Sequence, residues 1–319
     1  VLLLKTARGE LFSFNPVESG RDNWNATVFG ASGSGKSVCL NLLLTTAMLS
    51  NVTKGRVMVV DFAGETKSSY LQVAELFGGQ FVPVVSRRAG GGVSINPFPS
   101  PAIALDASGS LKSEHLSFLL VLTNLLLNNT GGDMQAALHS QILQAGLKLC
   151  YAHRTAADGA PTYQTLATVL EGMKGSVTDR DRLERVRTLL SGFLDSPDSR
   201  FFKNASNVVA DAPFVIFDLH GIDGLAPQTR EALVFLTTQY VKRVAFEEEG
   251  ISYVVLDEVA QLLRRPELRA LVDELYSTAR KHRTSVWTVT QNYGSYVQSG
   301  LHETIKLNST TQLFLSHAT

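Results

Sequence analysis

Short apolar runs separated by helical patterns fill the first hundred residues of the chain. Each run is four or five residues long, the length and composition of a strand buried in a sheet. These runs predict strands at Val1–Leu4, Leu11–Phe14, Ala26–Phe29, Arg56–Val60 and Gln80–Val84. We expect the first two strands to form a hairpin. We expect Pro83 to place the last strand at a sheet edge, because proline donates no ladder hydrogen bond.

The pattern becomes purely helical after a glycine- and proline-rich break between residues 90 and 101. Apolar residues then recur at helical spacing over 113–127, over 133–150, after a cap at Thr162, and from Thr178 onward. In the second of these helices we expect Leu138, Ile142 and Leu149 to form the buried stripe. Residues 103–200 are therefore predicted to be an all-helical insertion subdomain whose stripes form core rather than a binding surface.

Alternation of strands with helices resumes after residue 200. Strands are predicted at Phe214–Asp218, Tyr253–Asp257, Ser285–Thr290 and Thr310–Leu315, and helices at Pro227–Phe246 and from Pro266. Strands that alternate with helices typically build a parallel sheet with helices on both faces. We therefore expect an α/β fold with a mostly parallel sheet, formed discontinuously by residues 1–102 and 201–319.

Composition places the chain among globular proteins. Of its 319 residues, 44% are hydrophobic and 18% are charged, and 29 basic side chains balance 29 acidic ones. The zero net charge argues against a large nonspecific nucleic-acid surface, which normally shows a basic excess. Cys39 and Cys150 lack metal-ligand spacing and are expected to be reduced thiols. No apolar run reaches the roughly 18 residues of a membrane span. Because the chain begins in mid-strand without Met, we expect it to be part of a longer protein.

The first candidate site is Gly30-Ala31-Ser32-Gly33-Ser34-Gly35-Lys36-Ser37, between a predicted strand and a predicted helix. It fits the pattern G-x-x-x-x-G-K-[ST] of a phosphate-binding P-loop, or Walker A motif. Its glycines let backbone N–H groups and the helix N-terminus face phosphate oxygens. In such loops the lysine reaches the β- and γ-phosphates and the last hydroxyl ligates Mg²⁺. The expected nucleotide-binding residues are Gly30, Ser32, Gly33, Ser34, Gly35, Lys36 and Ser37.

A pair of acids at the end of a later buried strand supplies the second element. Asp257 and Glu258 follow four apolar residues, as the acidic Walker B pair does in P-loop ATPases. Asp257 would hold Mg²⁺ through water, together with Ser37, and Glu258 would polarise the attacking water. The two elements together predict ATP and Mg²⁺ as ligands and Mg²⁺-dependent ATP hydrolysis as the reaction.

Three further polar residues each have two interpretations. Asp61 ends a predicted strand, where it either contacts nucleotide or metal-bound water, or caps the turn at Gly64–Thr66. Arg280 lies at the basic end of a predicted helix, where it either complements the helix dipole or reaches the γ-phosphate of a neighbouring subunit. Gln291 follows a predicted strand and either senses the γ-phosphate or is a surface amide. The predicted catalytic set is Lys36, Glu258, Gln291 and Arg280.

The order of these elements carries a family resemblance. In chain order they are the P-loop, the strand ending at Asp61, Ser94-Ile95-Asn96-Pro97-Phe98, the helical insertion, Val215–Leu219, Leu256–Leu263, Ala279–Lys281 and Thr290–Asn292. The order resembles that of the large transport ATPase of bacterial type IV secretion and conjugation machines. This ATPase is the fourth component of the VirB series, called TraC or TrbE in conjugative plasmids. The resemblance covers nearly the whole chain, as the family's C-terminal RecA-like ATPase domain.

The resemblance also implies partners and a location. Members of the family form hexamers, stay cytoplasmic with a peripheral attachment to the inner membrane, and contact other components of the secretion machine there. The expected function is ATP hydrolysis that energises substrate transfer and the assembly of the pilus or apparatus.

Two other functions share parts of this pattern. A DNA-translocating motor of the HerA/FtsK or coupling-protein kind has the same loop, acidic pair and glutamine, and would add direct DNA contact. Such pumps use a basic pore loop, and no obvious basic loop appears in the sequence of the sheet domain. A scaffold that binds ATP without turnover would lack Lys36 or Glu258, and both are present.

Overall fold

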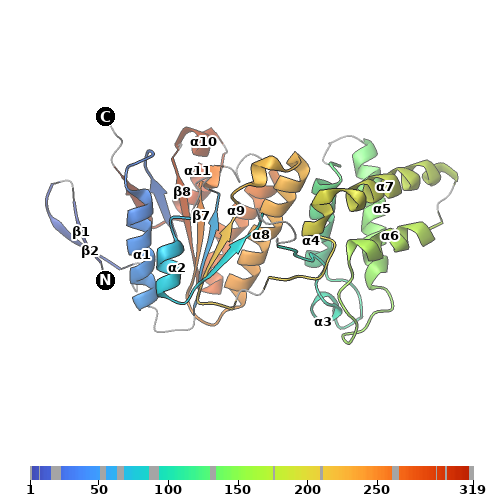
Figure 1. Ribbon diagram of the computed structural model, residues 1–319, viewed down its shortest axis with the longest axis horizontal. Helices are drawn as coiled ribbons and strands as arrows, with labels where there is room; N and C mark the ends of the chain where they lie inside the picture. The colour runs from blue at the N-terminus through green and yellow to red at the C-terminus, as the bar shows by residue number, and fades with distance from the viewer. Residues whose placement is uncertain are drawn as a thin grey trace. The chain divides into compact units, whose positions relative to one another are not determined.

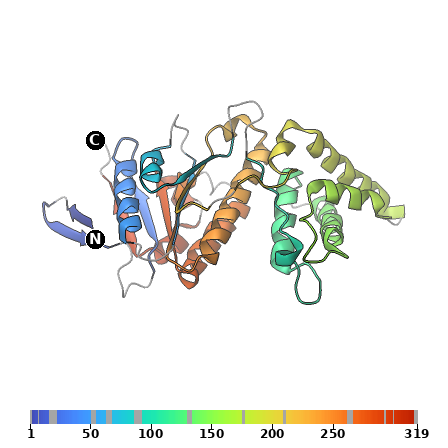
Figure 2. The ribbon, with the colours of Figure 1, turned by 60° about the horizontal axis from the view of Figure 1, so that its bottom comes forward.

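The computed structural model describes residues 2–6, 8–15, 23–50, 55–62, 68–85, 93–129, 134–174, 177–208, 211–260, 266–291, 293–298 and 300–315. The chain divides into two compact units. One comprises Val1–Val85, Ala210–Gly221 and Thr237–Thr319, and the other comprises Ser86–Val209 and Ile222–Leu236. Figures 1 and 2 show a helix-covered sheet in the first unit and a group of helices in the second. The predicted insertion, residues 103–200, lies within the second unit, which extends beyond it on both sides.

A seven-stranded sheet with the order β5-β6-β4-β7-β8-β3-β9 forms the centre of the first unit. Every pairing in it is parallel, so all its strands end at the same edge. The expected α/β fold class is confirmed, and β5, which contains Pro83, lies at a sheet edge as predicted. The strands are β3 (Ala26–Phe29), β4 (Val57–Asp61), β5 (Gln80–Pro83), β6 (Phe214–Asp218), β7 (Ser252–Asp257), β8 (Thr284–Thr290) and β9 (Thr311–Phe314). A separate antiparallel hairpin joins β1 (Leu2–Lys5) to β2 (Leu11–Phe14), as predicted.

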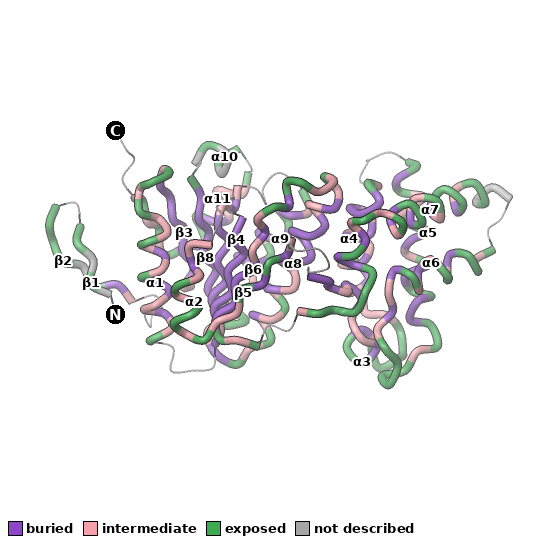
Figure 3. The backbone as a smooth tube through the Cα atoms, in the orientation of Figure 1, coloured by how far each residue is buried: buried purple, intermediate pink, exposed green. Residues whose placement is uncertain are grey.

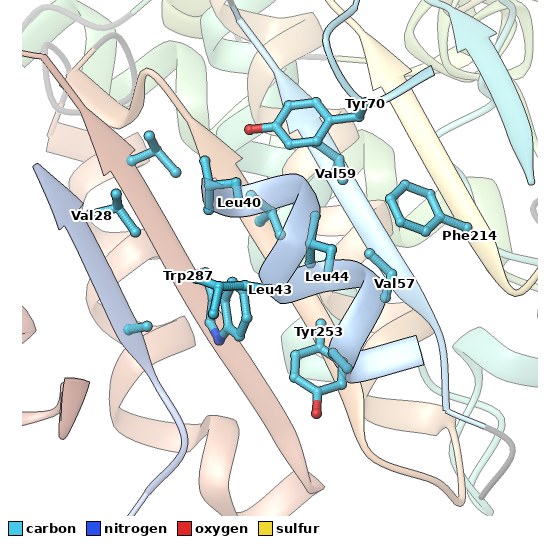
Figure 4. Packing of buried hydrophobic residues seen from close by; sticks show 14 of the residues in the cluster. Val28, Leu40, Leu43, Leu44, Val57, Val59, Tyr70, Phe214, Tyr253 and Trp287 are labelled. Carbon is cyan, nitrogen blue, oxygen red and sulfur yellow. The ribbon is translucent and has the colours of Figure 1, made fainter. Parts of the chain in front are cut away.

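Helices cover both faces of this sheet. On one face lie α1 (Lys36–Ser50) and α2 (Leu71–Leu76), and Leu44 of α1 shares a buried cluster with Val59 and Trp287 of the strands (Figure 4). On the other face, α9 (Pro266–Thr278) hydrogen-bonds to β8, and α8 (Pro227–Glu247) places Tyr240 edge-on to Phe217 with ring centroids 5.7 Å apart. The central strands are buried along their length (Figure 3), which explains the apolar runs of β4 and β7.

The second unit contains the helices predicted for the insertion. They are α4 (Ser113–Leu126), α5 (Met134–Tyr151), α6 (Tyr163–Gly172) and α7 (Val177–Asp195), preceded by a single turn, α3 (Pro101–Ala104). Thr162 caps α6 as predicted, because its hydroxyl accepts a hydrogen bond from the backbone N–H of Thr165. The apolar pattern therefore identified these helices from local spacing and capping chemistry.

The predicted stripe of α5, Leu138, Ile142 and Leu149, is wrong in phase. Leu149 is 47% exposed, whereas Leu143 and Leu147 are buried. Gly146 lies on the buried face, where a Cβ would meet a methyl carbon of Leu166 in α6 at 3.0 Å. The absent side chain lets Leu166 and Leu170 of α6 approach this face of α5 at Gly146.

Two short helices follow β8 that the apolar pattern does not predict. They are α10 (Tyr293–Gln298) and α11 (His302–Leu307), which lead to β9. Cys39 in α1 and Cys150 in α5 are free thiols, as expected. In the part of the chain that the structure describes, no helix is both long and apolar enough to cross a lipid bilayer.

Candidate functional site

Polar residues follow five neighbouring strands at the point where each strand ends. Across the sheet, Asp218 ends β6, Asp61 ends β4, Asp257 ends β7, Gln291 follows β8, and the P-loop follows β3. Asp61 pairs in register with both Asp218 and Asp257, so three aspartates lie in one row. The carboxyl edge of an open parallel sheet is where such folds bind ligands.

A cavity of about 290 Å³ opens at this edge. Most of the residues predicted for the site line it. Arg280 does not line the cavity, and neither do the P-loop residues Gly30 and Ser34. Val38 and Ser69 line the cavity without having been predicted. The full lining is Ser32, Gly33, Gly35, Lys36, Ser37, Val38, Asp61, Ser69, Asp257, Glu258 and Gln291.

The P-loop has the backbone geometry of a phosphate cradle. Gly33 and Gly35 have φ values of +76° and +88°, a backbone conformation that residues other than glycine rarely adopt. A Cβ at Gly30 would lie 2.4 Å from the hydroxyl oxygen of Ser34, so this glycine allows the loop to fold back on itself. The Ser34 hydroxyl is buried and has no hydrogen-bond partner among the described residues. The Ser34 hydroxyl, beside the start of α1, could therefore donate a hydrogen bond to a bound anion.

Lys36 is held by its own loop. Its ammonium group donates to the carbonyl oxygens of Gly30 and Ala31 at 2.8 Å and 2.9 Å. These are neutral acceptors, and a phosphate would offer charge-assisted bonds about twice as strong. The side chain is therefore placed to leave these carbonyls for a bound phosphate.

Asp257 and Glu258 form the acidic end of β7. Asp257 is 6% exposed, and its carboxylate accepts hydrogen bonds from the Tyr70 hydroxyl at 2.7 Å and from the Glu258 N–H at 2.9 Å. Burial, together with the negative charges of Asp61 and Glu258, raises the pKa of Asp257 to about 7. The hydrogen bond from Tyr70 offsets part of this rise. Glu258 has a φ of +53°, a strained conformation for this residue type that directs the chain out of the strand.

Asp61 reaches the same cavity from β4. It is 2% exposed, and one carboxylate oxygen accepts a hydrogen bond from the Ser68 hydroxyl at 2.7 Å. This position agrees with a role toward nucleotide or metal-bound water. The alternative partners, Gly64–Thr66, lie outside the described residues.

Gln291 lies beside the P-loop because β8 pairs with β3. The Gly30 N–H contacts the carbonyl of Thr290 at 3.4 Å, and Gln291 follows directly as an exposed residue that lines the cavity. The structure therefore brings this amide to the loop that would hold phosphate, while its predicted role as a sensor stays a prediction.

Arg280 lies away from the cavity of its own chain. It belongs to the 3₁₀ turn Ala279–His282, directly before β8 begins, and is exposed. The seven residues of β8 span roughly 20 Å between this edge of the sheet and the P-loop edge. A contact between Arg280 and a γ-phosphate would therefore require a neighbouring subunit, and this role stays a prediction.

The donor set fits a nucleotide with Mg²⁺. The loop supplies N–H groups, the Ser34 hydroxyl and the Lys36 ammonium for phosphates. Burial and the neighbouring acids Asp61 and Glu258 raise the pKa of Asp257, and a nearby cation would stabilise its charged form. No described cluster of three His, Cys, Asp or Glu side chains could hold a metal by itself.

Comparison with known families identifies the family of the chain. The TraG P-loop domain family matches residues 11–318. The chain belongs to this family. No curated protein matches the sequence closely enough to add a relative.

Solved structures share the fold of this TraG P-loop domain. VirB4 of Thermoanaerobacter pseudethanolicus matches with a TM-score of 0.79 at 21% identity, over 99% of this chain and 84% of that chain. The plasmid coupling protein TrwB with ADP and Mg²⁺ matches with a TM-score of 0.56 at 15% identity, over 90% of this chain and 69% of that chain. TrwB with the ATP analogue ADPNP gives 0.54 at 15% identity, over 92% and 70%. Family and fold confirm the expected class, a P-loop domain of the TraG family with the fold of VirB4 and of the plasmid coupling protein TrwB.

Proposed function

We propose that this domain binds ATP with Mg²⁺ and hydrolyses it to energise substrate transfer and the assembly of the pilus or apparatus. The observation that carries the proposal is the cavity at the carboxyl edge of the sheet. It joins Lys36 and Ser37 of the P-loop to Asp257 and Glu258 at the end of β7 and to Gln291 after β8. TrwB, which shares the fold, was solved with ADP and Mg²⁺, and we propose the same class of ligand here.

Different residues of the site would have different roles in phosphoryl transfer. Backbone N–H groups from Ser32 to Lys36 would hold the β-phosphate, and the Lys36 ammonium would move from its loop carbonyls to the β- and γ-phosphates. Ser37 and Asp257 would hold Mg²⁺, which supplies positive charge against the phosphate oxygens.

Glu258 and Gln291 would act on the water. The water oxygen attacks the γ-phosphorus, the bond from phosphorus to the β–γ bridging oxygen breaks, and ADP and phosphate are released. Glu258 would orient the water and accept its proton, and the positive φ of Glu258, which turns the chain out of β7 beside the cavity, supports this role. Gln291 would report the presence of the γ-phosphate to β8, beside the loop.

A second copy of the chain would complete this site. Arg280 of the neighbouring subunit would reach the γ-phosphate, since it lies at the sheet edge opposite its own P-loop. In the full protein we propose a hexamer that is cytoplasmic and attached peripherally to the inner membrane, where it meets other secretion components.

A DNA-translocating motor is the second candidate, because the fold is shared with a plasmid coupling protein. The experiment that separates the two is ATP turnover with and without single- and double-stranded DNA. Turnover that is indifferent to DNA supports the secretion ATPase, as the zero net charge favours. Strong stimulation by DNA would replace it with the motor. Lys36→Ala is the control, and it should remove turnover under every condition.

A further inference from the structure

Tyr70 joins two parts of the site that lie far apart in sequence. It is completely buried at the N-terminus of α2, and its ring belongs to the apolar cluster under α1. Its hydroxyl donates to Oδ2 of Asp257 at 2.7 Å. Figure 4 shows Tyr70 at the opposite end of this cluster from Tyr253, toward the carboxyl ends of the strands. The ring is therefore fixed by the core and only the hydroxyl reaches the acidic site.

The Tyr70 phenol is one of two protein donors to this carboxylate. Because the Glu258 N–H donates to Oδ1 at 2.9 Å, protein groups hold both oxygens of the Asp257 carboxylate. Each oxygen keeps the capacity to accept a further hydrogen bond.

The segment that carries Tyr70 is anchored at each of its residues. The Ser68 hydroxyl donates to Asp61 at 2.7 Å, and the Ser69 carbonyl accepts a hydrogen bond from the Asn41 amide of α1 at 2.8 Å. Three successive residues thus contact β4, the P-loop helix and β7. Such a segment can hold the aspartate of β7 in a fixed orientation relative to the P-loop.

We propose that Tyr70 is a positioning residue that orients the Asp257 carboxylate toward a Mg²⁺-bound water. This proposal rests on the proposed function, because it assigns Asp257 to the metal. In this arrangement each oxygen of Asp257 can still accept one hydrogen bond from a water on the ion, as the proposed function requires. Side chains that orient metal-site groups in this way typically change metal affinity or activity by about 10- to 100-fold when removed.

The test is a Mg²⁺ titration of fluorescent ATP-analogue binding, with the whole chain as wild type, Tyr70→Phe and Tyr276→Phe. Tyr276 is the matched control, since it is also buried and its hydroxyl hydrogen-bonds within the sheet unit, to Thr288 at 2.8 Å. We expect Tyr70→Phe to raise the half-saturating Mg²⁺ concentration by about 10- to 100-fold. Affinity in EDTA should stay unchanged, and Tyr276→Phe should match wild type in both readouts.

The same titration in an Asp257→Asn background tests the route of the effect. There, adding Tyr70→Phe should cause no further shift, because the hydroxyl acts through that carboxylate. A Tyr70→Phe protein that titrates like Tyr276→Phe would overturn the proposal, as would a full further shift in the Asp257→Asn background. The readout needs no turnover. An inactive wild type that still binds nucleotide with Mg²⁺ would overturn the proposed hydrolysis and leave this test decisive.

Discussion

The Lys36 ammonium donates to the carbonyl oxygen of Gly30 at 2.8 Å, so the P-loop lysine is bound to the residue that opens its own loop. The ammonium is thereby held at the mouth of the phosphate cradle without an acidic partner in these two contacts. Lys36→Ala should lower affinity for an ATP analogue by about 10- to 100-fold, the effect of losing one hydrogen bond to a charged group. Equilibrium binding by fluorescence measures this.

Lys112→Ala is the control for that substitution. Lys112 also donates to a backbone carbonyl, that of Ile103, at 2.8 Å, but it belongs to the helical unit. Its replacement should leave nucleotide affinity unchanged. Equal losses in both variants would mean that Lys36 acts on general folding rather than on phosphate.

Gln291 is placed to contribute to turnover more than to binding. Gln291→Ala should lower kcat by up to about tenfold with KM unchanged, the effect of one hydrogen bond made in the transition state. Steady-state ATP hydrolysis measures both constants. Gln298→Ala, at an exposed amide of α10, is the matched control. An unchanged kcat in Gln291→Ala would identify Gln291 as a surface amide.

Arg280 should contribute to ATP turnover only when subunits assemble. Turnover per subunit of the wild type should rise with protein concentration, and Arg280→Ala should remove this rise by lowering turnover about 10³-fold in the assembled state. Lys281→Ala, at the next exposed cation, should behave like wild type. Specific activity that is flat over a wide dilution range would contradict this role and leave Arg280 as a cation at a helix end.

Gly55 aligns the two acidic strands. A Cβ at this position would lie 1.8 Å from the carbonyl oxygen of Ile251, just before β4 and β7 pair in the register that sets Asp61 beside Asp257. Gly55→Ala should therefore destabilise the sheet unit by about 3 kcal/mol or more, since backbone must shift. Gly192→Ala, in α7 where the new methyl meets nothing within 4 Å, should instead stabilise the chain by about 0.5–1 kcal/mol. Urea unfolding measures both, and equal effects would contradict the account.

Local chemistry made the strands and the main site predictable. The P-loop and the acids at the end of β7 carry their signals in adjacent residues. The strand at Ser285–Thr290, which leads to Gln291, is recognisable from its valine, threonine and tryptophan side chains. The parallel sheet then brings these segments to one edge without further information.

The parts that the sequence did not predict depend on partners distant in the chain. Tyr70 is 187 residues from the carboxylate that it contacts, and no pattern around it distinguishes it from a core tyrosine. The stripe of α5 failed for a related reason. Leu149 and Leu147 are equally apolar, and the choice between them follows from the approach of α6 at Gly146.

The most direct test of the central claim is Mg²⁺-dependent phosphate release from ATP by the wild type and by Glu258→Gln. We expect turnover in the wild type that EDTA abolishes, and turnover lower by about 10²- to 10⁴-fold in Glu258→Gln with nucleotide affinity retained. Glu75→Gln, at an exposed glutamate of α2, should match wild type. Turnover in Glu258→Gln equal to that of the wild type would contradict the assignment of this site as the centre of ATP hydrolysis.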